Sequence, residues 1–445
     1  MTESSSARPH TGPRVAVLVV GVVVVAFALI DRWLTVRRGF SAPVGTVPFL
    51  VFGGLLVAAG LFGRNVVPAY RGTATILLNV ILLLVLVEGA SAMLRRWRAR
   101  NRVERSYEEM AWHPFYRDKP WAAEYWREFE ESKPMAYAPF VIFRRRPYNG
   151  QYIHIDRDRR RVTPGANCAP GAFVVYMFGG STMWGTGSPD SASIPAYVQQ
   201  GLAKRVSGPV CVVNFGESAY VSLQGMIQLA LQLRAGARPN AVVFYDGIND
   251  VGTTWQFGRA GSHSDQSDIA AAFERRSAVR QLAEQTSTYA VLRQSFAPVR
   301  RDTFPIAGLA DSVVHNYLGV TEVVRALGKA YGFRTLFFWQ PALSESGKVM
   351  TALEKRDVGT RARRHLQLFA ETYTRMRAIA ARDSADDLHD LSSVLADMRG
   401  DVFLDQAHLT PDGNARVAAA MLRAWDGLPD CTAPRGCAPA ALAAR

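Results

Sequence analysis

The stretch Phe173-Val174-Val175-Tyr176-Met177-Phe178-Gly179-Gly180-Ser181-Thr182 carries the main information about the fold. Its first six residues are apolar and rich in β-branched and aromatic side chains, which is typical of a buried strand. Two glycines follow, and they allow a tight turn that leaves the hydroxyl of Ser181 within reach of a substrate. A Gly-Ser turn by itself is a weak signal, so its interpretation depends on what surrounds it.

Outward from this stretch, strand and helix patterns alternate. The predicted strands are 173–178, 210–215, 241–245 and 335–339, with a short one before Ser392. The predicted helices are 194–206, 222–235, 312–331, 361–381 and 412–425. This alternation predicts an α/β fold with a parallel sheet covered by helices on both faces. Reactive loops of such sheets gather beyond the carboxyl ends of the strands.

Three more polar motifs are expected at this edge of the sheet. Asn214-Phe215-Gly216 and Gly247-Ile248-Asn249-Asp250 each end an apolar run, and Asp405-Gln406-Ala407-His408 lies far downstream. A histidine three residues after an aspartate allows the carboxylate to orient the imidazole. Ser, Gly, Asn and His therefore occur in this order, each at the end of a predicted strand or in the loop beyond.

These motifs resemble those of the SGNH (GDSL-type) hydrolase family, over roughly residues 171–426. The resemblance implies a flavodoxin-like parallel sheet and an acyl-enzyme on Ser181, with His408 as the base and Asp405 as its orienting acid. It also implies an oxyanion hole made by the backbone N–H groups of Ser181 and Gly216 and the side-chain amide of Asn249. The family's name motif has aspartate directly before the serine, where this chain has glycine.

The residues that flank Asn249 have a structural interpretation. Asp246 and Asp250 are expected to hydrogen-bond the turn, since Asp and Asn are common in turns. The histidines 263, 315, 365 and 389 show no spacing typical of metal ligands, so no metal and no cofactor is expected.

Three apolar stretches precede the sheet region, at about 14–34, 42–63 and 73–95. A helix needs about 20 apolar residues to cross the hydrocarbon core of a bilayer, so these stretches predict three transmembrane helices. A cleaved signal peptide is less consistent with the first stretch, because no small-residue cleavage pattern follows it.

Two features of the sequence favour opposite sides of the membrane for the catalytic domain. The net charge is +14, but six arginines from Arg95 to Arg105 directly follow the third stretch, and no nucleic-acid-binding module is recognisable. Basic residues there set topology or touch anionic lipid, and their distribution favours a cytoplasmic catalytic domain. The local pairs Cys168 with Cys211 and Cys431 with Cys437 fit an oxidising compartment instead, although four buried thiols are equally consistent. Because membrane-anchored relatives mostly face outward, an extracytoplasmic domain on a bacterial inner or plasma membrane is the expectation.

The predicted organisation has five parts. They are an N-terminal tail (1–13), a transmembrane region (14–95), a juxtamembrane connector (96–165), a hydrolase domain (166–428) with an insertion at about 251–312, and a C-terminal tail (429–445). The aromatic residues of the connector, among them Trp121, Tyr125, Trp126, Phe129 and Tyr137, are expected to pack, with glycan binding as the alternative. Residues 255–261 of the insertion could form a lid over the pocket or a peripheral segment.

The sequence thus predicts a membrane-anchored serine ester hydrolase: an esterase, an O-deacetylase or a lipase-like enzyme. Its expected partners are membrane lipids and an ester of a membrane-proximal envelope glycan or lipid, with no nucleic acid. The alternatives are an O-acyltransferase and a non-catalytic glycan-binding protein of envelope assembly that keeps the fold. A transporter is disfavoured, because three spans carry no paired intramembrane charges.

Overall fold

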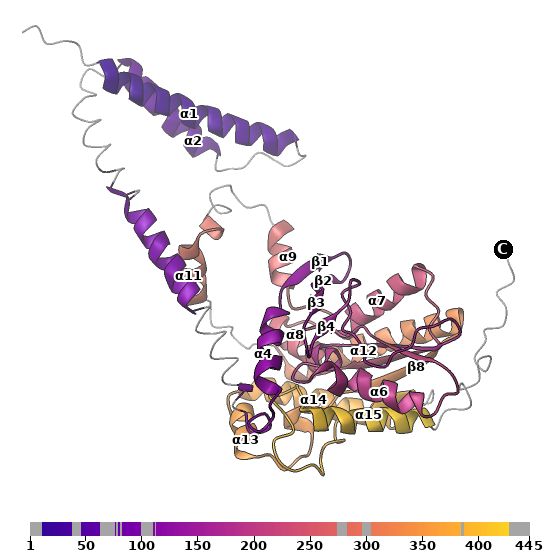
Figure 1. Ribbon diagram of the computed structural model, residues 1–445. Coiled ribbons are helices and arrows are strands. Elements are labelled where there is room, and N and C mark those ends of the chain that lie inside the picture. The colour runs from indigo at the N-terminus through magenta and orange to yellow at the C-terminus, as the bar shows by residue number, and fades with distance from the viewer. Residues whose placement is uncertain are drawn as a thin grey trace, which may run out of the picture. The chain divides into compact units, whose positions relative to one another are not determined.

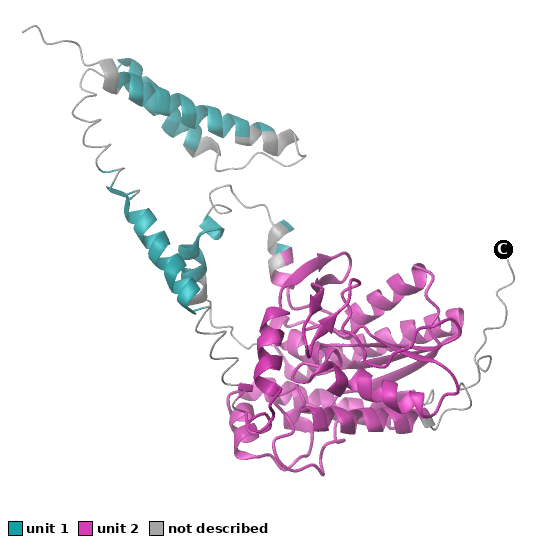
Figure 2. Ribbon diagram, in the orientation of Figure 1, with its two compact units in different colours: residues 1–102, 270–300 teal, residues 103–269, 301–445 magenta. Residues whose placement is uncertain are grey.

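The computed structural model describes residues 11–37, 46–62, 76, 79–80, 82–98, 110–111, 113–273, 283–295, 304–383 and 387–426 (Figure 1). The chain divides into two compact units (Figure 2). The first unit comprises residues 1–102 and 270–300, and the second comprises residues 103–269 and 301–445. All of the predicted catalytic residues lie in the second unit.

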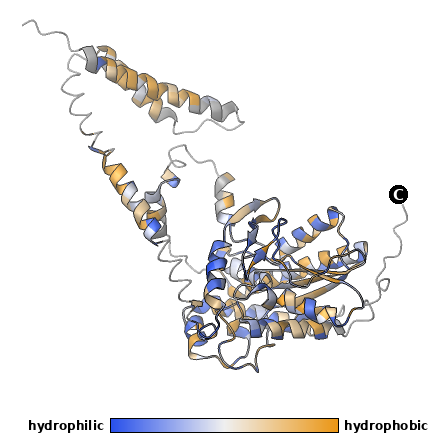
Figure 3. Cartoon of the chain, viewed as in Figure 1, coloured by the Kyte–Doolittle hydropathy of each residue, from blue (hydrophilic) through white to orange (hydrophobic). Residues whose placement is uncertain are grey.

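The first unit contains α1 (Thr11–Arg37), α2 (Thr46–Phe62), a helical segment at residues 82–98 and α11 (Ser287–Ser295). Both α1 and α2 are largely apolar (Figure 3). They pack closely because glycines face the partner helix: a Cβ added at Gly21 would lie 2.7 Å from the backbone nitrogen of Val57. Small residues of this kind allow two helix backbones to approach each other.

The structure does not show the three predicted transmembrane helices within the residues that it describes. No helix of the described residues is both long enough and apolar enough to cross a membrane. The third predicted stretch, 73–95, also lies partly outside the described residues.

Glu88 connects two parts of the first unit that are distant in sequence. Its carboxylate accepts hydrogen bonds from the backbone N–H groups of Ser287 and Thr288, at 2.5 and 3.0 Å, and from the Thr288 hydroxyl at 2.8 Å. These N–H groups begin α11 and have no partner within the helix, so Glu88 caps α11 from the helical segment 82–98.

The second unit is built on a five-stranded parallel sheet with the order β6-β5-β7-β8-β9. In chain order this is 2-1-3-4-5, the predicted flavodoxin-like arrangement. The chain adds β6 on one side of β5 and then β7 on the other side, so the strand order reverses there. Strands β5 and β7 pair with each other. The strands are β5 (Phe173–Gly179), β6 (Val210–Asn214), β7 (Ala241–Asp246), β8 (Arg334–Trp339) and β9 (Leu388–Asp390).

Helices cover both faces of this sheet (Figure 1). Successive strand residues point to opposite faces, so Met177 belongs to one buried cluster and Phe178 to the other. The first cluster includes side chains of α6 (Ile194–Ala203) and α15 (Pro411–Asp426). The second includes side chains of α7 (Ser222–Arg234), α8 (Ile248–Phe257), α12 (Ile306–Tyr331) and α14 (Arg363–Ala380). The short elements are α5 (Ser181–Trp184), η1 (Asp190–Ala192), α9 (Gln266–Phe273), η2 (Leu343–Glu345) and α13 (Ala352–Gly359).

Most of the predicted connector is part of the second unit. It forms α4 (Ala122–Glu131) and two antiparallel pairs, β1 (Met135–Ala138) with β2 (Ile142–Arg145) and β3 (Tyr148–Asn149) with β4 (His154–Ile155). Tyr125, Trp126 and Phe129 are buried together with Trp184, which follows the nucleophile, as expected if the connector aromatics pack. Tyr137, in contrast, is 73% exposed.

The predicted insertion begins differently from the expectation. Residues 251–257 are not irregular but belong to α8, which starts beside Asn249. Trp255 packs against the second core cluster, and its ring centroid lies 5.5 Å from that of His365 on α14. A lid formed by residues 255–261 is therefore not supported for this helical part.

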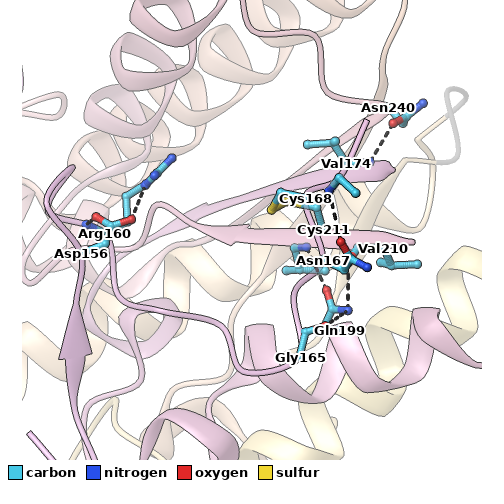
Figure 4. The surroundings of a disulfide bond; sticks show 12 residues. Asp156, Arg160, Gly165, Asn167, Cys168, Val174, Gln199, Val210, Cys211 and Asn240 are labelled. Atoms are coloured by element: carbon cyan, nitrogen blue, oxygen red, sulfur yellow. Dashed lines mark hydrogen bonds and ion pairs between the residues drawn. A yellow bond between two sulfur atoms is a disulfide. The ribbon is translucent and has the colours of Figure 1, made fainter. Parts of the chain in front are cut away.

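A disulfide bond joins Cys168 to Cys211 (Figure 4). It ties the segment before β5 to strand β6, and backbone bonding continues this link, because the Asn167 N–H donates to the Val210 carbonyl at 2.8 Å. Gln199 on α6 donates to the same carbonyl at 3.1 Å. The other expected pair, Cys431 with Cys437, lies outside the described residues.

Candidate active site

The nucleophile candidate sits at the end of a central strand. Strand β5 ends at Gly179, Gly180 is the N-cap of α5, and Ser181 is the first residue of that short helix. The helix turns at once, since the N–H groups of Trp184 and Gly185 donate to the carbonyls of Gly180 and Ser181, each at 3.0 Å. This strand–turn–helix path places Ser181 at the carboxyl edge of the sheet, beside the point where the strand order reverses.

The structure brings Ser181, His408 and Asp405 together. Ser181 Oγ lies 2.7 Å from His408 Nε2, and His408 Nδ1 lies 2.7 Å from Asp405 Oδ2. The other carboxylate oxygen of Asp405 accepts the backbone N–H groups of Ala407 and His408, each at 2.8 Å. The backbone of this loop therefore fixes the position of the Asp405 carboxylate. With the proton on Nδ1, the imidazole can accept the serine proton at Nε2.

Asp405 and His408 each stabilise the charged form of the other. Burial alone would raise the pKa of Asp405, but the charge and hydrogen bonds of His408 hold this pKa well below its ordinary value. Burial would lower the pKa of His408, yet Asp405 raises it above the ordinary 6.5. The two side chains remain partly accessible, at 21% for His408 and 40% for Asp405, so a substrate can approach from solvent.

Asn249 lies beside the serine turn, at the start of α8, which directly follows strand β7. Its Nδ2 donates to the carbonyl of Tyr220 at 2.8 Å, and among the described residues no acceptor is observed for the second amide hydrogen. The amide lies directly against Gly180, because a Cβ added at residue 180 would overlap Asn249 Nδ2. Gly180 has an extended backbone that any residue can adopt, with φ −81° and ψ −155°. The glycine therefore leaves room for the Asn249 amide beside the serine turn.

Gly216 does not offer the predicted oxyanion donor. Its N–H donates to the side-chain oxygen of Asn214 at 2.9 Å and is thus already engaged. A Cβ at this position would overlap the backbone nitrogen of Trp184, so the glycine allows the loop after β6 to lie against α5. The interpretation of Gly216 changes from a donor to a residue that permits close packing.

Ala219 is a donor candidate that the sequence did not reveal. It has a φ of 59°, which is uncommon for a residue other than glycine. Among the described residues, no hydrogen bond of its N–H group is observed. It precedes Tyr220, whose carbonyl binds the Asn249 amide and would lie 3.3 Å from a Cβ at Gly180. Only an unusual backbone angle marks this residue, and such an angle is not visible in a sequence.

The aspartates that flank Asn249 differ from each other. Asp250 accepts the Ser222 hydroxyl at 2.6 Å and the Ser222 N–H at 3.2 Å, so it joins α8 to the start of α7. Backbone hydrogen bonds from Gly247 and Asp250 also favour its charged form, as expected for a carboxylate that supports its own turn. Asp246 is also buried, but its Oδ2 has no hydrogen-bond partner in the described part of the chain. Burial raises the pKa of both carboxyl groups.

Two buried arginines of the connector support the turn that carries the nucleophile. The Trp184 ring lies between the guanidinium groups of Arg145 and Arg161, at 4.0 and 4.2 Å from its centroid. Arg161 also donates to the Trp184 and Gly185 carbonyls, at 3.1 and 2.7 Å, and so satisfies the end of α5. Arg145 donates to Ser218 at 2.9 Å, next to Ala219. Both sides of the site are therefore tied to the connector.

No metal-binding arrangement accompanies the triad. Within the described ranges, no group of three or more His, Cys, Asp or Glu residues could hold a metal ion.

No protein-family model matches the chain, and no curated protein matches it. Among solved structures it resembles a member of the lipolytic protein G-D-S-L family from Veillonella parvula, with 12% identity over 58% of this chain and 100% of that one, at a TM-score of 0.35. It also resembles the acetyl xylan esterase AlAXEase, with 15% identity over 57% of this chain and 100% of that one, at a TM-score of 0.35. A third is a catalytic mutant of Axe2, an acetylxylan esterase from Geobacillus stearothermophilus, with 14% identity over 59% of this chain and 96% of that one, at a TM-score of 0.31. Similarity at these TM-scores carries no weight for the activity, which rests on the geometry of the triad.

Proposed function

We propose that this chain is a serine ester hydrolase that forms an acyl-enzyme on Ser181. The observation that carries the proposal is the continuous hydrogen-bonded path from Ser181 Oγ through His408 to Asp405, with 2.7 Å at each step. A serine hydroxyl is a weak nucleophile until an adjacent base accepts its proton, and this path supplies both the base and the acid that orients it.

In the proposed reaction, Ser181 Oγ attacks the ester carbonyl while its proton passes to His408 Nε2. Asp405 stabilises the imidazolium that forms. The proton then goes to the departing alkoxide, which leaves an acyl group on Ser181. Water attacks this acyl-enzyme while His408 accepts its proton; the bond between Ser181 Oγ and the acyl carbon then breaks, His408 returns the proton to Oγ, and the carboxylic acid is released. An acceptor hydroxyl in place of water would give the acyltransferase alternative.

The negative oxygen of each tetrahedral intermediate needs preorganised donors. We assign this role to the backbone N–H groups of Ser181 and Ala219 and to the amide of Asn249. The Tyr220 carbonyl holds the Asn249 amide beside the serine turn, at 2.8 Å. Ala219 replaces Gly216 in this set because the Gly216 N–H is engaged by Asn214.

The setting of this activity is also a proposal. The disulfide between Cys168 and Cys211 supports an oxidising, extracytoplasmic compartment for the second unit. The largely apolar helices α1 and α2 support association of the first unit with a lipid surface (Figure 3). An ester of an envelope glycan or lipid is the substrate class that fits this setting.

Labelling with a serine-directed fluorophosphonate tests the proposed chemistry. We expect one label on the purified chain, mapped to Ser181 by mass spectrometry, together with hydrolysis of 4-nitrophenyl acetate. Ser181→Ala should abolish both. Ser393→Ala is the matched control, since Ser393 is exposed and makes no side-chain contact with the triad. A chain that takes no label and hydrolyses no ester, yet binds an envelope glycan, would favour the non-catalytic alternative.

A further inference from the structure

A cavity lies on the second unit and is lined in part by the connector. It has a volume of about 290 Å³, and its walls include Phe115, Lys119, Trp121, Tyr152, Ser191 and Asp412. We call it the connector pocket. Three of these side chains are aromatic, and the other three carry an ammonium, a hydroxyl and a carboxylate. None of them belongs to the triad.

The aromatic side chains of the connector form two layers. Tyr116, Tyr125 and Trp126 are buried and form the inner layer. Trp121 packs its ring against this layer, with its centroid 5.7 Å from that of Tyr116. Trp121 and Tyr152 are only partly buried and line the pocket, with centroids 6.4 Å apart and planes inclined at 49°. The inner layer accounts for packing, and the outer layer leaves aromatic surface open to a ligand.

One wall of the pocket is held by a buried ion-pair network around Asp190. The Asp190 carboxylate accepts Arg161 Nε at 2.6 Å and the His154 N–H at 2.9 Å. The Asp190 N–H donates to the Tyr152 carbonyl at 2.9 Å. Tyr152 and the neighbouring Ser191 are thereby held in one arrangement, so the pocket is formed before any ligand binds.

The opposite wall is joined to the same loop. Asn414, on α15, donates to the Ser188 hydroxyl at 2.9 Å and to the Ala192 carbonyl at 3.1 Å. This contact fixes the start of α15, where Asp412 lies, against the segment that follows the nucleophile turn. The pocket is thus built by the chain segments that leave Ser181 and His408.

We infer that the connector pocket binds a sugar ring of an uncharged glycan. A pyranose presents a face of C–H groups, which matches the partly exposed rings of Trp121 and Tyr152, and a rim of hydroxyls, which matches the polar groups beside them. Lys119 and Asp412 bring one charge of each sign, so the pocket does not select for an anionic phosphate or lipid headgroup. Its volume is near the lower end of the range for small-molecule sites, about 300–1,000 Å³, which suits one or two sugar rings.

As a substrate subsite, the pocket rests on the hydrolase function proposed above, and it would direct that activity toward acylated glycans. Binding itself is tested without catalysis. We would use the full chain carrying Ser181→Ala and record saturation-transfer NMR and calorimetric titrations with xylopentaose, cellopentaose and chitopentaose. At least one of these should bind, and Trp121→Ala should weaken that binding about tenfold or more.

Two further variants keep the test decisive if Trp121→Ala unfolds. Asp412→Asn and Lys119→Ala change polar groups at the rim and should each weaken the same titration severalfold. Tyr137→Ala is the matched control, since this aromatic residue of the connector is 73% exposed and lies outside the pocket. It should bind like the unmodified chain.

Three results would overturn the inference. They are the absence of binding to all three oligosaccharides, binding that the pocket variants leave unchanged, and binding of vesicles containing anionic lipid that the pocket variants abolish. Fluorophosphonate labelling of Ser181 in the otherwise unmodified chain is read separately. Failure of the pocket inference and failure of the hydrolase proposal therefore give different results.

Discussion

Replacing Gly180 by alanine should impair catalysis while the fold is retained. The new Cβ would overlap Asn249 Nδ2, which is the far end of a side chain and can move. The backbone at residue 180 is in an extended region that alanine adopts without strain. The overlap is therefore relieved when the Asn249 amide moves away from the Tyr220 carbonyl and from the serine turn.

The contacts of Asn249 set the expected size of the loss in stability and of the loss in turnover. Loss of the 2.8 Å hydrogen bond from Asn249 to Tyr220 should lower the free energy of unfolding by about 0.5–1.5 kcal/mol. Loss of one oxyanion donor costs about 2.7–4 kcal/mol in the transition state, or about 10²–10³ in kcat. Gly180→Ala should therefore resemble Asn249→Ala in turnover of 4-nitrophenyl acetate.

A double-mutant cycle isolates this mechanism. In the Asn249→Ala background the amide is already absent, so adding Gly180→Ala should cost almost nothing further. Gly252→Ala is the matched control, because a Cβ at Gly252 meets nothing within 4 Å and should leave kcat unchanged. Near-normal turnover by Gly180→Ala, or two losses that multiply in the double variant, would refute the proposed link between Gly180 and Asn249.

Three further predictions concern protonation and stability. Only neutral His408 can act as the base, so kcat/KM should fall as the pH falls through the pKa of His408, with a midpoint above 6.5. A flat profile of kcat/KM from about pH 5 to 8 would contradict this prediction. Cys168→Ala opens a disulfide with a sequence separation of 43 and should lower the free energy of unfolding in urea by about 4 kcal/mol, whereas equal stability with and without reductant would argue against the bond. Arg161→Met leaves Asp190 buried without its main partner and should cost about 3–5 kcal/mol, while Arg127→Met, at an exposed pair, should cost less than about 1 kcal/mol; similar losses would contradict the role of burial.

Much of the second unit could be predicted from the order of residues along the chain. Strands buried on both faces are nearly continuous runs of apolar residues, as β7 is up to Asp246, so they stand out between amphipathic helices. The Asp405 to His408 contact is local, and the carboxyl ends of parallel strands meet at one edge, so Ser181 and Asn249 could be placed near each other without coordinates. The flavodoxin-like order follows from the same alternation and from the family resemblance.

What the sequence could not decide depends on contacts between distant segments. Gly216 and Ala219 are three residues apart, and their roles differ because Asn214 engages one N–H while an unusual backbone angle leaves the other without an observed partner. The reason for Gly180 lies in the Asn249 amide, which a different strand delivers.

The connector shows the same limit. Its composition predicted a juxtamembrane connector with packed aromatic residues, but not that Arg145 and Arg161 would be buried against Trp184 in the unit that holds the triad. A sequence displays which side chains are apolar or charged, and local periodicity turns this into strands and helices. Which N–H group is free, which Cβ has room and which aromatic face stays open are settled only when segments far apart in the chain pack together, because each depends on the atoms of a neighbour that the local sequence does not contain.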